Sequence, residues 1–136
     1  MLGPLANAIE RQWPIQRIGW QFSPDMDTGP IAVILEFSGL DIVIGIDPDD
    51  DTIAIESSAN SAVAARYERT QPDLEGWLVV AAWALINEQG YFDGVQLGFS
   101  PRPGPAERCW QCVAVASTFR VTRLDSTMVS PRRSRA

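Results

Sequence analysis

The sequence contains no histidine and no lysine, and only two of its 136 residues are cysteine. Without histidine the chain lacks the usual general base and the commonest metal ligand, which excludes Ser–His–Asp and Cys–His arrangements. Two cysteines are too few for a disulfide framework, so a reducing cytoplasm is the expected compartment. All eleven basic residues are arginine, which we attribute to genomic composition rather than to mechanism.

Long hydrophobic runs are also absent. No stretch reaches the roughly 18 uninterrupted apolar residues of a membrane span, so no contact with a membrane is expected. The first residues, Met1 to Leu5, lack the basic and apolar segments of a secretory signal. The length fits one domain with a core of its own, which we place at residues 1–125. The arginine-containing residues 126–136 are expected to form a disordered tail.

The net charge of -6 is unevenly distributed along the chain. Residues 1–59 carry ten acids against two arginines, a net of -8, whereas residues 60–136 carry nine arginines against seven acids, a net of +2. A surface that binds phosphates needs clustered basic residues, so the acidic half argues against nucleic acid as a partner. It favours a protein partner with a basic surface.

Alternating apolar residues predict four short strands in the first half, at residues 15–22, 30–37, 40–46 and 52–56. Turn-forming residues separate them, as in an antiparallel meander. Before the first strand, residues 2–13 are compatible with a short helix that Pro14 ends, because the residue before a proline is pushed out of the helical region.

The second half repeats this layout. Residues 77–86 are nearly all apolar, which is compatible with a helix or a strand, but they lead through a turn at Asn87–Gly90 into an obvious strand. In addition, Trp83 and Leu85 fall where Trp20 and Phe22 fall in the first half. We therefore interpret residues 77–86 as a strand.

The chain is thus predicted to be two copies of one meander, at residues 15–57 and 77–124. The connector at residues 58–76 is expected to contain a short helix that begins at Asn60 or Ser61 and ends at Arg69. The predicted fold is mainly β, with about eight antiparallel strands and one or two short helices. Whether the sheet closes into a barrel, or pairs its edges between subunits, stays open.

Six carboxylates are predicted to lie at one rim of the first meander, because the turns after its first and third strands share one end of the sheet. These residues are Asp25, Asp27, Asp47, Asp49, Asp50 and Asp51. Clustered charge of one sign accelerates encounter with a partner of the opposite sign and disfavours other partners. We expect this acidic rim to bind the protein partner.

The same aspartates suggest a second possibility, because Asp47, Asp49 and Asp51 are spaced like the first ligands of a calcium loop. Such a loop needs glycine at its sixth position and glutamate at its twelfth, where this chain has Thr52 and Ser58. No metal ligand is assigned. A divalent-cation-binding structural or regulatory domain remains the alternative function.

The pair Cys109 and Cys112 has the C-x-x-C spacing of redox and zinc sites. In a strand, positions i and i+3 point to opposite faces, so the two sulfur atoms are expected to lie too far apart for a disulfide. Zinc would need two further cysteine or histidine ligands, and the sequence has none. Both cysteines are interpreted as packing residues.

A carboxylate-based enzyme is the third possibility, with Glu88 and Asp93 as an acid–base pair. No pocket-like sequence surrounds them, and Asp93 is expected to accept hydrogen bonds from backbone N–H groups of the preceding turn. No catalytic residue and no cofactor is assigned. The five tryptophans are interpreted mainly as core residues.

One segment resembles a family of small bacterial proteins of uncharacterised function. It runs from Trp83 to Phe99 and has the pattern W-x-L-x-N-x-Q-G-Y-x-D-G-x-Q-L-x-F, and the Asp-rich turn from Asp47 to Thr52 is also similar. The resemblance implies no catalytic residues. Proteins of this size and acidity also resemble immunity proteins of bacterial toxin systems. The leading hypothesis is therefore a non-enzymatic, immunity-type inhibitor that binds a basic toxin surface with its acidic rim.

Overall fold

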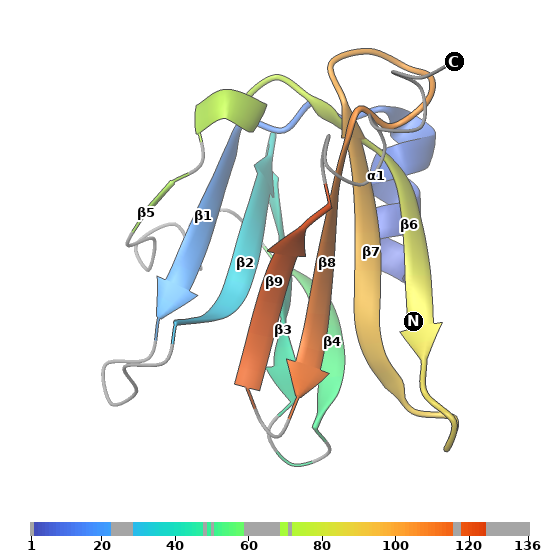
Figure 1. The fold of residues 1–136 in the computed structure, drawn as a ribbon. Coiled ribbons are helices and arrows are strands. Elements are labelled where there is room, and N and C mark those ends of the chain that lie inside the picture. Colours follow the sequence, from blue (N-terminus) through green and yellow to red (C-terminus); the bar gives the residue numbers. More distant parts are fainter. Residues whose placement is uncertain are drawn as a thin grey trace.

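The computed structural model describes residues 2–22, 29–47, 49, 51–58, 69–70, 72–115 and 118–124 (Figure 1). Its regular elements, in chain order, are α1 (Gly3–Arg11), β1 (Arg17–Phe22), β2 (Pro30–Phe37), β3 (Leu40–Asp47), β4 (Thr52–Ser58), β5 (Arg69–Thr70), the 3-10 turn η2 (Pro72–Leu74), β6 (Leu78–Ile86), β7 (Phe92–Ser100), β8 (Arg108–Val115) and β9 (Thr118–Arg123). The predicted class, mainly β and antiparallel, is confirmed. The described part has one strand more than the expected eight, the two-residue β5.

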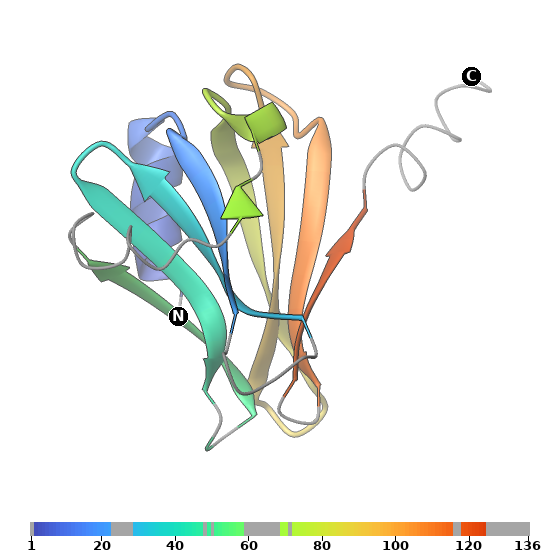
Figure 2. The same cartoon turned by 90° about the vertical axis from the view of Figure 1, so that its left-hand side faces the viewer.

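The strands form two antiparallel sheets that pack face to face (Figures 1 and 2). The first sheet has the order β4-β3-β2-β1-β5, and the second has the order β6-β7-β8-β9. Strand β4 lies across β7 and β8, while β2 lies across β9. The two sheets therefore form an open sandwich with separate edges. Helix α1 packs against β6 and beside β4, and its Leu5 and Ala8 join the core between the sheets.

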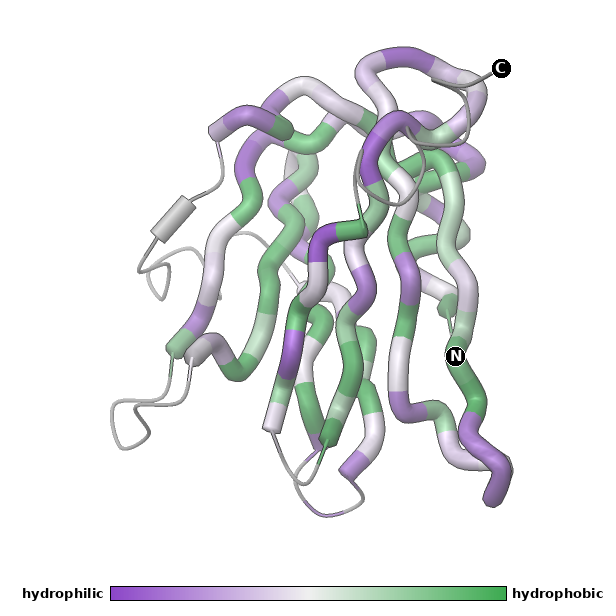
Figure 3. Tube along the Cα trace, viewed as in Figure 1, coloured by the Kyte–Doolittle hydropathy of each residue, from purple (hydrophilic) through white to green (hydrophobic). Residues whose placement is uncertain are grey.

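The core lies between the sheets and follows the predicted alternation. Val33, Leu35 and Phe37 of β2 face the second sheet and are fully buried. On β3 the same holds for Ile42 and Ile44. Figure 3 shows green segments along the strands of both sheets, with purple segments between them and at the turns. Because successive side chains of a strand point to opposite faces, the alternate apolar residues of each strand share the face that is buried.

Trp110 of β8 joins the two sheets. Its ring stacks on that of Trp20 from β1, with 5.4 Å between the ring centroids, and meets Phe99 of β7 edge-on at 5.1 Å. Arg123 of β9 places its guanidinium 5.7 Å from the centroid of the same ring. Trp110 is only 1% exposed, so one side chain contacts both layers of the core.

Strand β6 contains a bulge at Val80, where its register with β7 shifts between Val79 and Ala81. Val79 faces the core and is buried, but beyond the bulge the core-facing residues are Ala82 and Ala84, opposite Leu97 and Val95 of β7. Trp83 consequently points outward and is 48% exposed. The expected match between Trp83 and the inward-facing Trp20 is wrong in this respect, because one inserted residue exchanges the two faces of a strand.

The N-terminal helix and the connector differ from expectation in their bounds. Helix α1 ends at Arg11, before the predicted end at residue 13, because Gln12 adopts a left-handed conformation with φ 55°. Pro14 then forms an isolated bridge with Leu78. Most of the expected connector helix lies outside the described residues, but its expected end at Arg69 is instead in β5, which pairs with β1. The predicted tail at residues 126–136 also lies outside the described residues.

Substituting Trp110→Ala is expected to lower the free energy of unfolding by about 3–5 kcal/mol, because it leaves a cavity between the sheets. Tyr91→Ala is the matched control, since Tyr91 is 56% exposed and its truncation should cost about 1 kcal/mol or less. Urea unfolding followed by circular dichroism measures both values. Equal losses in the two variants would show that Trp110 does not join the sheets as described.

Candidate functional site

The acidic turn connects β3 to β4 and is ordered by its own aspartates. The Asp47 side-chain Oδ1 accepts a hydrogen bond from the backbone N–H of Asp49 at 3.0 Å. The backbone N–H of Asp51 donates to the carbonyl of Asp47 at 2.9 Å. Asp51 has a positive φ of 57°, a left-handed conformation that aspartate adopts more readily than most residues. Three carboxylates therefore occur within one tight turn, with Asp49 exposed.

The other predicted rim residues are not placed. Asp25, Asp27 and Asp50 lie outside the described residues. The described strand ends show that β1 and β3 finish at the same end of the first sheet, as predicted from the meander (Figure 1). Within the described ranges, no group of three or more His, Cys, Asp or Glu side chains is arranged to hold a metal ion.

Strands β6 and β8 of the second sheet also finish at this end (Figures 1 and 2). The turn after β6 carries Glu88 and Tyr91, and β8 ends at Val115. Tyr91 is 56% exposed and Val115 is 43% exposed, although both are large apolar residues. We use the term acidic turn end for this surface, defined by Asp47, Asp49, Asp51, Glu88, Tyr91 and Val115.

Asn87 organises the turn between β6 and β7. Its side-chain oxygen accepts hydrogen bonds from the backbone N–H groups of Gln89 and Tyr91, at 2.9 and 3.0 Å. Its side-chain amide donates to Asp93 Oδ2 at 3.2 Å. The expected role of Asp93 as acceptor of backbone N–H groups is therefore taken by Asn87, and Asp93 orients the Asn87 amide. This arrangement fixes the position of Tyr91.

The C-x-x-C pair lies on β8, and its two side chains occupy opposite faces as predicted. Cys112 points into the core and is fully buried, whereas Cys109 is partly exposed. Both are free cysteines. Burial removes water from the Cys112 thiolate and raises the pKa of this thiol to about 12. A reactive thiol needs the opposite shift, so Cys112 is a packing residue.

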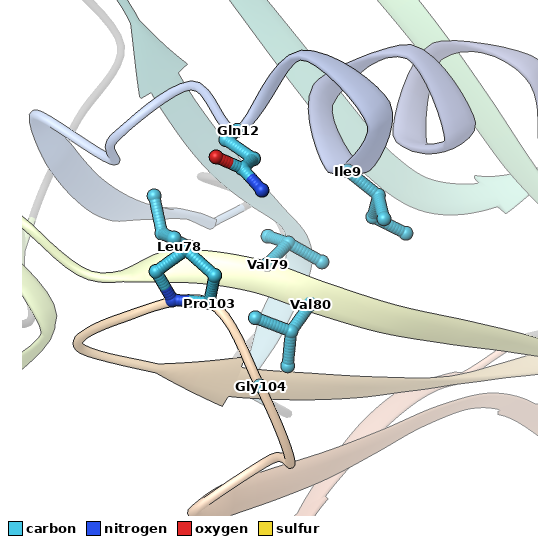
Figure 4. Close-up of a pocket in the computed structure, with 7 residues that line it drawn as sticks. All are labelled: Ile9, Gln12, Leu78, Val79, Val80, Pro103 and Gly104. Atoms are coloured by element: carbon cyan, nitrogen blue, oxygen red, sulfur yellow. The ribbon is translucent and has the colours of Figure 1, made fainter.

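A small pocket lies at the other end of β6, between α1 and the loop before β8 (Figure 4). Its volume is about 130 Å³, and it is lined by Ile9, Gln12, Leu78, Val79, Val80, Pro103 and Gly104. Gln12 is the one polar side chain among them. The space is well below the roughly 300 Å³ at which sites for drug-sized ligands begin. It holds no acid or base that would support catalysis by Glu88 or Asp93, which lie at the acidic turn end.

Arg108 is an anchoring residue that the sequence reasoning missed. Its guanidinium forms an ion pair with Asp73 of η2 and lies 5.1 Å from the centroid of the Trp77 ring. These contacts tie η2 and the start of β6 to β8. The ion pair joins two residues that are 35 positions apart in the chain, and no local pattern in the sequence predicts it.

The fold and these surfaces define an antiparallel two-sheet sandwich protein with an acidic turn end. The chain belongs to a family of unknown function, DUF6334, whose family model matches residues 7–128. The expected membership of an uncharacterised family is thereby confirmed. Searches of curated proteins and of solved structures returned no match. No helix among the described residues is long and apolar enough to cross a membrane.

Alkylation of the native protein near pH 8 is expected to modify Cys109 and to leave Cys112 unmodified, because the Cys112 thiol is buried and protonated. The same reagent should modify both thiols after unfolding in urea. Since the unfolded thiol ionises near pH 8.5 and the folded one only near 12, Cys112 also makes the fold less stable as the pH rises between these values. Peptide mass spectrometry identifies the modified residues, and rapid native labelling of Cys112 would contradict its placement.

Proposed function

We propose that this protein is a non-enzymatic binding module whose acidic turn end contacts a basic surface of a protein partner. The observation that carries the proposal is that carboxylates and exposed apolar side chains occur at the same end of the sandwich. Asp47, Asp49 and Asp51 come from the first sheet, while Tyr91 and Val115 come from the second. Interfaces combine these two kinds of residue, with apolar anchors inside a polar rim.

The two kinds of residue have different physical roles. Exposed carboxylates attract a basic partner over a distance of about 8–10 Å at moderate salt, and they mainly raise the association rate. Tyr91 supplies a large side chain, and the Asn87 turn holds the backbone from which this side chain projects. An aromatic residue on a fixed backbone loses less conformational freedom on binding than one on a mobile loop, so it mainly slows dissociation.

The more specific form of the proposal is an immunity-type inhibitor of a bacterial toxin. Such an inhibitor needs no catalytic group, because it acts by covering a surface of the toxin. The small acidic chain, its acidic turn end and the lack of an acid or base in the pocket of Figure 4 are compatible with this role. The toxin would present arginine or lysine side chains to Asp47, Asp49 and Asp51.

The partner is best sought by capture from native lysate on the immobilised full chain, with elution at low and at high salt. We expect a basic protein that high salt releases. Changing Asp47, Asp49 and Asp51 to Asn should weaken its binding at least tenfold, mainly through slower association. Asn keeps a side-chain oxygen that can accept the Asp49 N–H, so the turn should persist.

The matched control changes three other exposed acids, Glu10, Glu56 and Glu75, to Gln, which alters the net charge equally but away from the acidic turn end. Equal weakening by both triple variants would mean that net charge alone drives binding. Unchanged binding by the aspartate variant would refute the proposal. If the captured protein is a toxin, its expression alone should stop growth, and co-expression of this chain should restore it.

A further inference from the structure

We infer that β6 pairs with β6 of a second copy of this chain, giving a symmetric dimer with one continuous sheet of eight strands. The inference concerns the side of the second sheet, not the acidic turn end, so it stands or falls independently of the proposed function. It rests on three features of β6: an open backbone edge, the absence of charge, and the position of two exposed apolar side chains.

The backbone edge of β6 is covered over its first residues only. The Ile15 N–H donates to the Trp77 carbonyl at 2.8 Å, and Pro14 bridges to Leu78. Beyond the Val80 bulge this cover ends. In the described part of the chain, no backbone hydrogen bond joins residues 82–86 to any segment except β7. Every residue from Val80 to Ile86 is at least partly exposed.

Hydrogen bonds in the following turn identify which backbone groups face this open edge. The Asn87 N–H donates to Tyr91, and its carbonyl accepts from Gly90, so the Asn87 backbone faces β7. Because the direction alternates along a strand, Leu85 and Trp83 also face β7. The N–H and carbonyl groups of Ala82, Ala84 and Ile86 therefore point away from the sheet. Such a row of groups, otherwise solvated by water, is a template for pairing with another extended strand.

The absence of charged residues on β6 favours a second β6 as that strand. Long edge strands usually carry charged residues that prevent pairing with another chain. The edge strands β4 and β9 follow this rule, with Glu56 on β4 and Arg120 and Arg123 on β9. Strand β6 has the sequence LVVAAWALI and carries no charged or polar side chain. Two copies of β6 can therefore meet without repulsion between like charges.

The exposed side chains fix the register. A two-fold axis at Ala84 places Ala82 opposite Ile86 of the partner and Trp83 opposite Leu85 of the partner. Ile86 and Trp83, each 48% exposed in the single chain, are then both covered. Ala82, Ala84 and Ile86 would exchange about six hydrogen bonds across the axis. The pairing is isologous and uses the β6 edge of each copy, so it closes as a dimer instead of growing into a fibre.

Sedimentation equilibrium of the full chain tests the inference. We expect a species of twice the chain mass of 15.0 kDa. Trp83→Glu should raise the dimer dissociation constant at least tenfold. Adding Leu85→Arg should restore the dimer, because Glu and Arg then face each other across the axis, whereas adding Leu85→Glu should not. Thr122→Glu, on the exposed face of β9, is the matched control and should sediment like the wild type.

Circular dichroism and thermal melting establish that each variant is folded. A wild-type chain that sediments as a monomer at all concentrations overturns the inference, and so does a Trp83→Glu chain that dimerises like the wild type. The register has its own test in a Cys109→Ser background. Mixed Trp83→Cys and Leu85→Cys chains should form a disulfide-linked heterodimer under mild oxidation. Positions 83 and 85 would face each other as a non-hydrogen-bonded pair, in which the two Cα atoms lie about 4.5 Å apart. A dimer that persists without this cross-link contradicts the register.

Discussion

The contact of Trp110 with both sheets is the interaction on which the sandwich depends. A meander of four strands has one face that must be buried, and it cannot bury that face by itself. In this protein each meander buries the face of the other, and Trp110 contacts Trp20 of the first sheet and Phe99 of the second. The positions of the turns, and therefore of the acidic turn end, follow from how the two sheets align across this contact.

The sequence predicted most strands because polar residues mark their outer faces. In β4, the buried Ile53 and the partly buried Ile55 alternate with the exposed Glu56, so the pattern indicates which face enters the core. In β6 this contrast is missing. Every residue from Leu78 to Ile86 is apolar, and either set of alternate residues could enter the core. The Val80 bulge decides between them, and the apolar sequence of β6 gives no local signal for its position.

The candidate site was partly predictable because polar residues also mark the turns. Aspartate and proline mark the turn after β3, so the clustering of Asp47, Asp49 and Asp51 could be read from the chain. Their position at the same end as Tyr91 and Val115 depends on the alignment of two sheets that are distant in sequence, and no local pattern encodes it. The contact of Arg108 with Asp73 and Trp77 belongs to the same category. The exposed apolar residues thus lie in two separate places, one at the side of β6 and one at the turns.

The order of the elements along the chain has a consequence for synthesis on the ribosome. Strands β1 to β4 are complete by Ser58, but the residues that cover their inner face begin at Leu78 and end near Arg123. At about 5–20 residues per second, this apolar face stays uncovered for several seconds after β4 is made. The buried rows of β2 and β3 are therefore exposed in every nascent chain. Slow translation of the second meander should increase the demand for chaperones, although the finished protein contains the same residues and the same core.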